Sequence, residues 1–166
     1  MEKIQGNVHI FGENINTDDI VPSHCLTLRD EDEMAQFTCE NIYPNFAKNV
    51  KSGDVIIAGE NFGCGSSREE AVNVLKILGI SAIIAKSFAR IYFRNAINLG
   101  IPAITLNWSD KDFSDGDTVE INLQDGVIRN KSKKKKLQFK EFPPFLFRIL
   151  ENGGIVNLLK KRLHQD

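Results

Sequence analysis

The stretch that decides the fold reads Gly59-Glu60-Asn61-Phe62-Gly63-Cys64-Gly65-Ser66-Ser67-Arg68-Glu69-Glu70-Ala71. The apolar run Asp54 to Ala58 before it predicts a buried strand, and the pattern Ala71 to Leu78 after it predicts a helix. A helix that starts after such a loop points free backbone N–H groups, with partial positive charge, into the loop. Together with the hydroxyls of Ser66 and Ser67 and the guanidinium of Arg68, these groups predict a site for a carboxylate or phosphate.

Common glycine-rich motifs do not describe this loop. It lacks the Gly-Lys-Ser/Thr ending of a P-loop, the G-x-G-x-x-G spacing of a dinucleotide site and the G-x-S-x-G elbow of a hydrolase. A purely structural turn is the alternative, in which Ser67 caps the helix and Glu69 and Glu70 favour its first turn. The loop alone leaves both interpretations open.

The flanking sequence extends the α/β pattern. Further strands are expected at Ile4 to Phe11, Ser81 to Ala85, Ile101 to Leu106, Thr118 to Leu123 and Val127 to Arg129. Further helices are expected near Asp32 to Cys39, at Phe88 to Leu99 with Gly100 as C-cap, and at about Gly154 to Leu163.

The remaining segments are expected to be turns and loops. Gln124-Asp125-Gly126 predicts a hairpin turn, Ser23 to Asp30 reads as a loop, and the basic run Lys131 to Lys136 reads as a solvated loop. The expected architecture is a single domain, 1–166, of the α/β class. It has a central, mostly parallel sheet flanked by helices, with antiparallel hairpin additions.

Composition and charge argue against several classes of partner and location. The formal net charge of −1 gives no general attraction to nucleic acid or anionic membranes, and no apolar run is long enough to span a bilayer. The N-terminus lacks a signal-peptide layout, so a cytoplasmic location is expected. Cys25, Cys39 and Cys64 suit a reducing compartment, and their spacing forms no metal or cluster motif. No metal is therefore expected on this chain alone.

Three blocks of sequence carry a resemblance to a known family: Asn14-Ile15-Asn16-Thr17-Asp18-Asp19-Ile20-Val21-Pro22, Asn61 to Glu69, and Ala85-Lys86-Ser87-Phe88-Ala89-Arg90-Ile91-Tyr92 with its continuation to Pro102. In this order the chain resembles the small subunits of the 3-isopropylmalate dehydratase and homoaconitase group of the aconitase superfamily. The resemblance extends to about Leu106. It implies the swivelling β/β/α domain of that superfamily.

The resemblance also implies an activity. It indicates the reversible dehydration and rehydration of a dicarboxylate hydroxy-acid by an enzyme of two kinds of subunit. A large subunit would carry a 4Fe–4S cluster, one iron of which acts as a Lewis acid, and this chain would supply the base. The implied partners are that large subunit and the small-molecule substrate, with homo-oligomers expected when this chain is isolated.

Catalytic roles follow from the match. Ser66 lies at the position of the family's serine base, whose alkoxide must be stabilised by N–H groups, a helix end and cations. Gly63, Gly65 and Cys64 would form the backbone around it, with Cys64 packing near the site. Ser67 and Arg68 would bind substrate, Arg68 by clamping a carboxylate.

Other positions have supporting roles. Asp18 would orient a histidine of the large subunit, although a structural ion pair between Asp18 and Arg68 is the alternative. Thr17 is expected to cap the turn that contains Asp18. In the third block Ser87 is expected to be the next N-cap, with Phe88 in the core and Arg90 bracing the loop.

Specificity is expected to depend on Leu26, Thr27, Leu28 and Arg29. Thr27 stands where relatives with tricarboxylate substrates carry an arginine, and a neutral residue cannot pair with a distal carboxylate. This favours isopropylmalate and leucine biosynthesis. A homoaconitase subunit, if Arg29 turns inward, and a 2,3-dimethylmalate dehydratase subunit remain alternatives. A non-enzymatic RNA-binding role is disfavoured by the near-zero charge. His24 reads as a surface histidine.

Overall fold

The computed structural model describes residues 1–165 and confirms the α/β class. One seven-stranded sheet has the order β4-β3-β2-β1-β5-β6-β7. Pairings from β1 to β4 are parallel, and those from β1 through β5 and β6 to β7 are antiparallel. The strands are β1 (Ile4–Ile10), β2 (Val55–Ala58), β3 (Ala82–Ala85), β4 (Ala103–Thr105), β5 (Thr118–Asn122), β6 (Val127–Asn130) and β7 (Lys135–Gln138).

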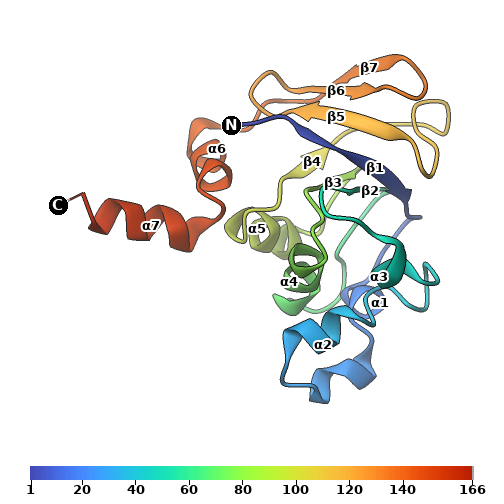
Figure 1. Cartoon of the computed structure of the whole chain (residues 1–166), viewed down its shortest axis with the longest axis vertical. Helices are drawn as coiled ribbons and strands as arrows, with labels where there is room; N and C mark the ends of the chain where they lie inside the picture. Colours follow the sequence, from blue (N-terminus) through green and yellow to red (C-terminus); the bar gives the residue numbers. More distant parts are fainter. Residues whose placement is uncertain (166) are drawn as a thin grey trace.

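Helices cover one face of the parallel strands, while β5, β6 and β7 curl over the other face (Figure 1). The α-helices are α1 (Thr17–Ile20), α2 (Glu31–Ala35), α3 (Phe46–Asn49), α4 (Glu70–Ile77), α5 (Arg90–Asn98), α6 (Pro144–Glu151) and α7 (Ile155–Leu163), and a 3₁₀ turn, η1, spans Ser23–Thr27. The result is the expected layering of antiparallel sheet, parallel sheet and helices.

The parallel strands are apolar throughout because both of their faces are buried. Ile56 and Ile83 point into the core on the helix side. Their neighbours Ile57 and Ile84 point into a second core shared with Ile121 of β5. Alternation along each strand therefore fills both cores, and it fixes the register that places the loops after β1, β2 and β3 side by side.

Several expectations about local structure were wrong. Lys135 and Lys136 lie in the edge strand β7, and only the residues from 131 to 134 form a turn. Long Lys side chains are tolerated there because an edge strand pairs on one side only. The helix α6 was not expected, the helix predicted to reach Cys39 ends at Ala35, and η1 occupies a segment expected to be a loop.

None of the helices among residues 1–165 is long and apolar enough to cross a membrane.

Candidate active site

The Gly-rich loop lies between two flanking segments that continue the order β1-β2-β3 beyond the ends of the strands. We call residues 14–18 the first strap and residues 87–89 the second strap. Parallel bridges join Asn16 to Cys64 on one side and Phe62 to Phe88 on the other. On the second side, Ser87 O accepts from Phe62 N at 3.0 Å, and Phe62 O accepts from Ala89 N at 2.9 Å. The loop backbone is therefore held from both sides.

Two glycines of the loop are required by its backbone and by close contacts. Gly63 has a φ of +82°, and a Cβ built there would lie 2.1 Å from Cγ of Tyr92. Gly65 has a φ of +99°, and its Cβ would lie 2.5 Å from Oδ1 of Asn16. Tyr92 is itself fixed, since its hydroxyl donates to Ala71 O at 2.9 Å. A larger residue at Gly63 would clash with α5, and one at Gly65 would clash with the first strap, so either would displace the loop.

The first strap brings a second hydroxyl to Ser66. The Oγ1 of Thr17 lies 3.0 Å from the Oγ of Ser66, so the two hydroxyls share a hydrogen bond. Thr17 is buried, and its N–H donates to Cys64 O at 2.8 Å. Ser66 is exposed. The exposed hydroxyl of Ser66 is thus oriented by the buried hydroxyl of Thr17. Thr17 is itself fixed, because moving it would break the hydrogen bond from its N–H to Cys64 O.

Arg68 and Asp18 form an ion pair, with Nη1 of Arg68 3.0 Å from Oδ1 of Asp18. Among residues 1–165, Asp18 engages a single guanidinium N–H and no other partner engages the rest, and the Arg68 side chain is 33% exposed. The remaining N–H groups are free to bind a carboxylate from solvent. The pairing foreseen as the structural alternative is therefore present, and it leaves room for the clamp.

The backbone between Ser66 and α4 supplies further donors. Within residues 1–165, the N–H groups of residues 65–70 donate no hydrogen bond. They lie directly before and at the first turn of α4, where the helix dipole adds partial positive charge. Unpaired N–H groups beside a hydroxyl and a guanidinium form an arrangement that can stabilise an anion or a developing oxyanion.

The capping predictions were wrong. Asn16 caps α1, because its side chain accepts from Asp18 N at 2.9 Å and the Asp19 side chain accepts from Asn16 N. Thr17 is the first residue inside that helix.

Two serine caps are also absent: the Ser67 cap, which belonged to the purely structural alternative, and the Ser87 cap, which was expected. The N-caps of α4 and α5 are Glu69 and Ala89, both without a side-chain cap bond. Ser67 is exposed, and Ser87 instead accepts from Asn61 N at 2.7 Å. Ser67 is therefore accessible from solvent, whereas the hydroxyl of Ser87 is used to hold the backbone of the Gly-rich loop. Phe88 is half-buried against the helix-side core as expected, and Arg90 is exposed.

The proposed substrate segment, residues 23–29, is held mainly by its own turns. Leu26, Thr27 and Arg29 are exposed, and the Thr27 hydroxyl donates to His24 O at 3.3 Å. Leu28 is half-buried and packs against the helix-side core, so it presents less surface than Leu26. Within residues 1–165, no hydrogen bond or ion pair joins this segment to residues 59–68.

His24 anchors the same segment at the surface. Its Nε2 lies 2.6 Å from Oε1 of Glu40, and its ring packs edge-on against Phe37. Cys25 beside it is buried, and burial followed by the negative charge of Glu40 raises the pKa of its thiol. His24 is a surface residue, as the sequence predicted.

The sequence did not predict the contact that Thr17 makes in the site. Thr17 was assigned to a cap, whereas its hydroxyl contacts Ser66. The signal available was the pairing of the Asn-Thr-Asp turn with a loop that follows the neighbouring parallel strand. Cys64 is half-buried beside these residues, as expected of a packing residue. Among residues 1–165, no group of three or more His, Cys, Asp or Glu is placed to hold a metal ion.

Comparisons with known proteins show which family this chain resembles in sequence and in fold. The family model described as the aconitase C-terminal domain matches residues 4–109. A 3-isopropylmalate dehydratase small subunit of Thermotoga maritima is 49% identical, covering 95% of this chain and 95% of its own length. An isopropylmalate/citramalate isomerase small subunit of Methanocaldococcus jannaschii is 46% identical, with 98% and 97% covered. The crystal structure of a 3-isopropylmalate dehydratase from the latter organism superposes with a TM-score of 0.92 at 48% identity, covering 99% of this chain and 98% of that one.

Proposed function

Because the chain belongs to the aconitase C-terminal domain family, as a small subunit of the 3-isopropylmalate dehydratase type, we propose that it completes the active site of a hydro-lyase that interconverts 2-isopropylmalate and 3-isopropylmalate. The partner is a large subunit, and the pathway is leucine biosynthesis in the cytoplasm. The observation that carries the proposal is the contact between Thr17 and Ser66 beside the unpaired N–H groups of residues 65–70.

The residues of this chain supply the proton-transfer part of the reaction. Ser66 takes the proton from the carbon next to a substrate carboxylate, as general base. A free serine is too weakly acidic for this task, so its alkoxide depends on the Thr17 hydroxyl, the helix end and Arg68. Arg68 holds the carboxylate through its unused N–H groups, and Ser67 adds a hydroxyl to the same carboxylate.

Asp18 has a second task in this scheme. Its Oδ1 holds Arg68, and its side chain is 57% exposed, which leaves Oδ2 free to accept from a histidine of the large subunit. The ion pair and the contact with the partner histidine are therefore compatible.

Among residues 1–165 no group of three or more His, Cys, Asp or Glu is placed to hold a metal, so the cysteines of this chain do not fit an iron–sulfur cluster. Cys25 and Cys39 are buried, and burial raises the pKa of both thiols, which disfavours the thiolates that ligate iron. We therefore place the 4Fe–4S cluster on the large subunit, where an iron without a cysteine ligand would supply Lewis-acid chemistry at the substrate hydroxyl.

In this proposal, the uncharged residues Leu26 and Thr27 of segment 23–29 determine which substrate is preferred. An apolar branch can lie against Leu26, whereas a third carboxylate would meet no cation unless Arg29 turned inward. A homoaconitase subunit and a 2,3-dimethylmalate dehydratase subunit are the alternatives. The name of the Methanocaldococcus relative adds citramalate, whose branch is smaller, to the substrates worth testing.

The test is turnover by the assembled enzyme. This chain is co-expressed with the large subunit encoded in the same genome, the cluster is rebuilt anaerobically, and kcat/KM is compared for isopropylmalate, citramalate, dimethylmalate and homocitrate. The proposal predicts the highest value for isopropylmalate and no activity of either subunit alone. A preference for homocitrate would contradict the assignment of Thr27 and implicate Arg29.

A further inference from the structure

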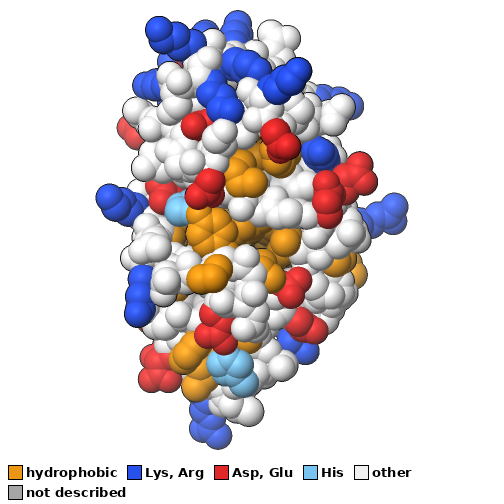
Figure 2. Space-filling model, turned by 90° about the vertical axis from the view of Figure 1, so that its right-hand side faces the viewer, with side chains coloured by type: hydrophobic (Ala, Val, Ile, Leu, Met, Phe, Trp, Pro, Cys, Tyr) orange, Lys and Arg blue, Asp and Glu red, His pale blue; other side chains and the backbone are white. Residues whose placement is uncertain are grey.

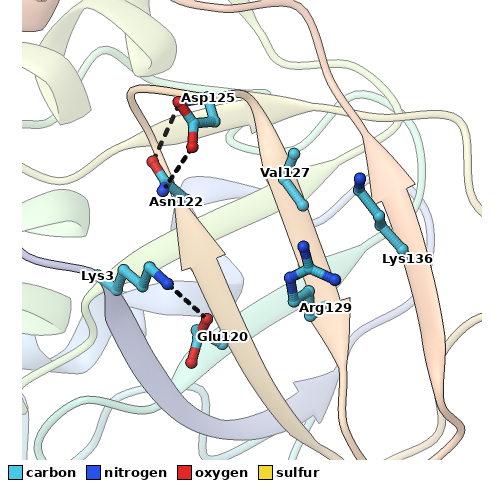
Figure 3. A pocket seen from close by; sticks show the side chains of 7 residues that line it. All are labelled: Lys3, Glu120, Asn122, Asp125, Val127, Arg129 and Lys136. Carbon is cyan, nitrogen blue, oxygen red and sulfur yellow. Dashed lines mark hydrogen bonds and ion pairs between the residues drawn. The ribbon is translucent and has the colours of Figure 1, made fainter.

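A polar hollow lies on the outer face of the antiparallel half, outside the candidate active site. Its volume is about 230 Å³. Its walls come from the chain before β1, from β5 and the turn after it, and from β6 and β7 (Figure 3). The lining residues are Lys3, Glu120, Asn122, Asp125, Val127, Arg129 and Lys136.

Strand register places two cations directly opposite each other in this hollow. Arg129 of β6 pairs with Glu120 on one side and with Lys136 on the other. The Glu120 carboxylate is already taken by Lys3 at 3.4 Å and Lys131 at 3.3 Å, whose hydrogen bonds lower its pKa, Lys131 first. Within residues 1–165, Arg129 and Lys136 make no ion pair or side-chain hydrogen bond. Like charges opposite each other destabilise a sheet.

Protection of the sheet edge does not explain this arrangement. Lysines on β7 can discourage pairing with another chain, because β7 is an edge strand. Arg129 lies on β6, which is paired on both sides, so it protects no edge. Every charged residue from Arg129 to Lys140 is a cation, although the whole chain has a net charge of −1. Lys and Arg side chains accordingly gather at the β5–β7 end of the molecule in Figure 2.

We propose that this hollow binds a small oxyanion carrying at least two negative charges, such as a diphosphate or a polycarboxylate, between Arg129 and Lys136. The planar guanidinium of Arg129 can bind one phosphate or carboxylate group through two N–H groups, and Lys136 supplies a point charge for the second group. A divalent anion cancels the repulsion between the two cations, whereas a monovalent anion leaves one of them uncompensated.

The shape of the hollow selects against larger anions. Glu120 and Asp125 line the β5 side, and the Asn122 amide holds Asp125 at 3.0 Å (Figure 3). These carboxylates confine an anion to the β6–β7 side and repel an extended chain of negative charge. The lining holds no aromatic residue on which a nucleic acid base could stack.

The test is an NMR titration of the ¹⁵N-labelled full chain with inorganic pyrophosphate at low salt. We expect saturable shifts at β6 and β7, and weakening by added salt because the site is exposed. Arg129→Gln should weaken binding at least about tenfold, since it removes two charge-assisted hydrogen bonds. Lys134→Gln removes the same charge from the same hairpin without touching the hollow, and it should change the affinity less than about twofold.

Three results would overturn the proposal. One is no saturable binding of pyrophosphate. Another is equal weakening by Arg129→Gln and Lys134→Gln, which would show general attraction to a basic hairpin. The third is tighter binding of a poly-glutamate peptide than of pyrophosphate, which would assign the face to an acidic protein. The titration measures no enzymatic activity, so its failure and that of the proposed function are independent.

Discussion

The candidate active site and the proposed substrate segment are held in place in different ways. The loop around Ser66 lies between two straps, which bond to its backbone and extend the order of the parallel sheet. Residues 23–29 are held by their own turns, by buried Cys25 and by the contact of His24 with Glu40. The difference predicts that the fold fixes the position of the proposed base, while the proposed specificity segment can change without disturbing it.

The largest effect on stability is expected from adding a methyl group to Gly63 in the loop that the two straps hold. Gly63→Ala combines a φ of +82° with a contact of 2.1 Å to Tyr92, so we expect it to lower the free energy of unfolding by about 3 kcal/mol or more. Urea denaturation measures the change. Gly12→Ala is the control, because Gly12 is exposed and its Cβ meets nothing within 4 Å; it should cost less than about 0.5 kcal/mol. Equal costs for both variants would show that the loop is not braced.

The hydroxyl beneath Ser66 should affect catalysis rather than binding. Thr17→Val keeps the shape of the side chain but removes the contact at 3.0 Å, and kcat of the assembled enzyme should fall by about tenfold or more with KM little changed. Thr38→Val is a matched control, since Thr38 is equally buried and its hydroxyl bonds to Ala35 O at 2.8 Å. A similar loss of kcat in both variants would reduce Thr17 to a structural role.

Substitutions in the proposed substrate segment, residues 23–29, should change substrate specificity without changing the fold. Thr27→Arg places a cation at the exposed position assigned to substrate, so the ratio of kcat/KM for homocitrate over isopropylmalate should rise by about fivefold, as expected for a partly solvated ion pair. Thr27→Val keeps the position neutral and should leave the ratio unchanged. If Thr27→Arg also left it unchanged, residues 23–29 would not face the substrate.

The smallest effect concerns alkaline stability, away from both regions. Burial, followed by the hydrogen bond to Asp115 and its charge, raises the pKa of Tyr43 from 10.0 to about 12. Between these values the native state keeps a proton that the unfolded state loses, so Tyr43 contributes stability that is lost as the pH rises through this window.

Tyr43→Phe tests this effect. Its free energy of unfolding should fall less steeply than that of the wild type between pH values of about 10 and 12. Urea midpoints over this range measure the two slopes, and parallel slopes would contradict the assignment to Tyr43.

The sequence predicted those parts of the fold whose signals are local. Strands such as β2 and β3 are short apolar runs between turn residues, and their periodicity identified them. The helix α6 was missed because Pro143 and Pro144 suggest a break, although proline is well tolerated at the first position of a helix. Lys135 and Lys136 form part of β7 because they pair with β6, and no local sequence pattern predicts that pairing.

The candidate site was predictable in its members but not in its contacts. The resemblance supplied Ser66, Arg68 and Asp18, and the structure brings Arg68 and Asp18 together. That Thr17 reaches Ser66 depends on parallel pairing of segments 49 residues apart, which periodicity cannot predict. Within residues 1–165, no hydrogen bond or ion pair joins residues 23–29 to the loop around Ser66, so their role in specificity stays a prediction.

The central claim is that Ser66 is the base, and exchange of the substrate proton tests it most directly. The assembled enzyme is incubated with isopropylmalate in D₂O, and incorporation of deuterium at the carbon next to the carboxylate is followed by NMR for wild type, Ser66→Ala and Ser67→Ala. We predict that Ser66→Ala loses exchange and turnover together by about a thousandfold, whereas Ser67→Ala mainly raises KM. Exchange at the wild-type rate in Ser66→Ala would contradict the claim and place the base elsewhere.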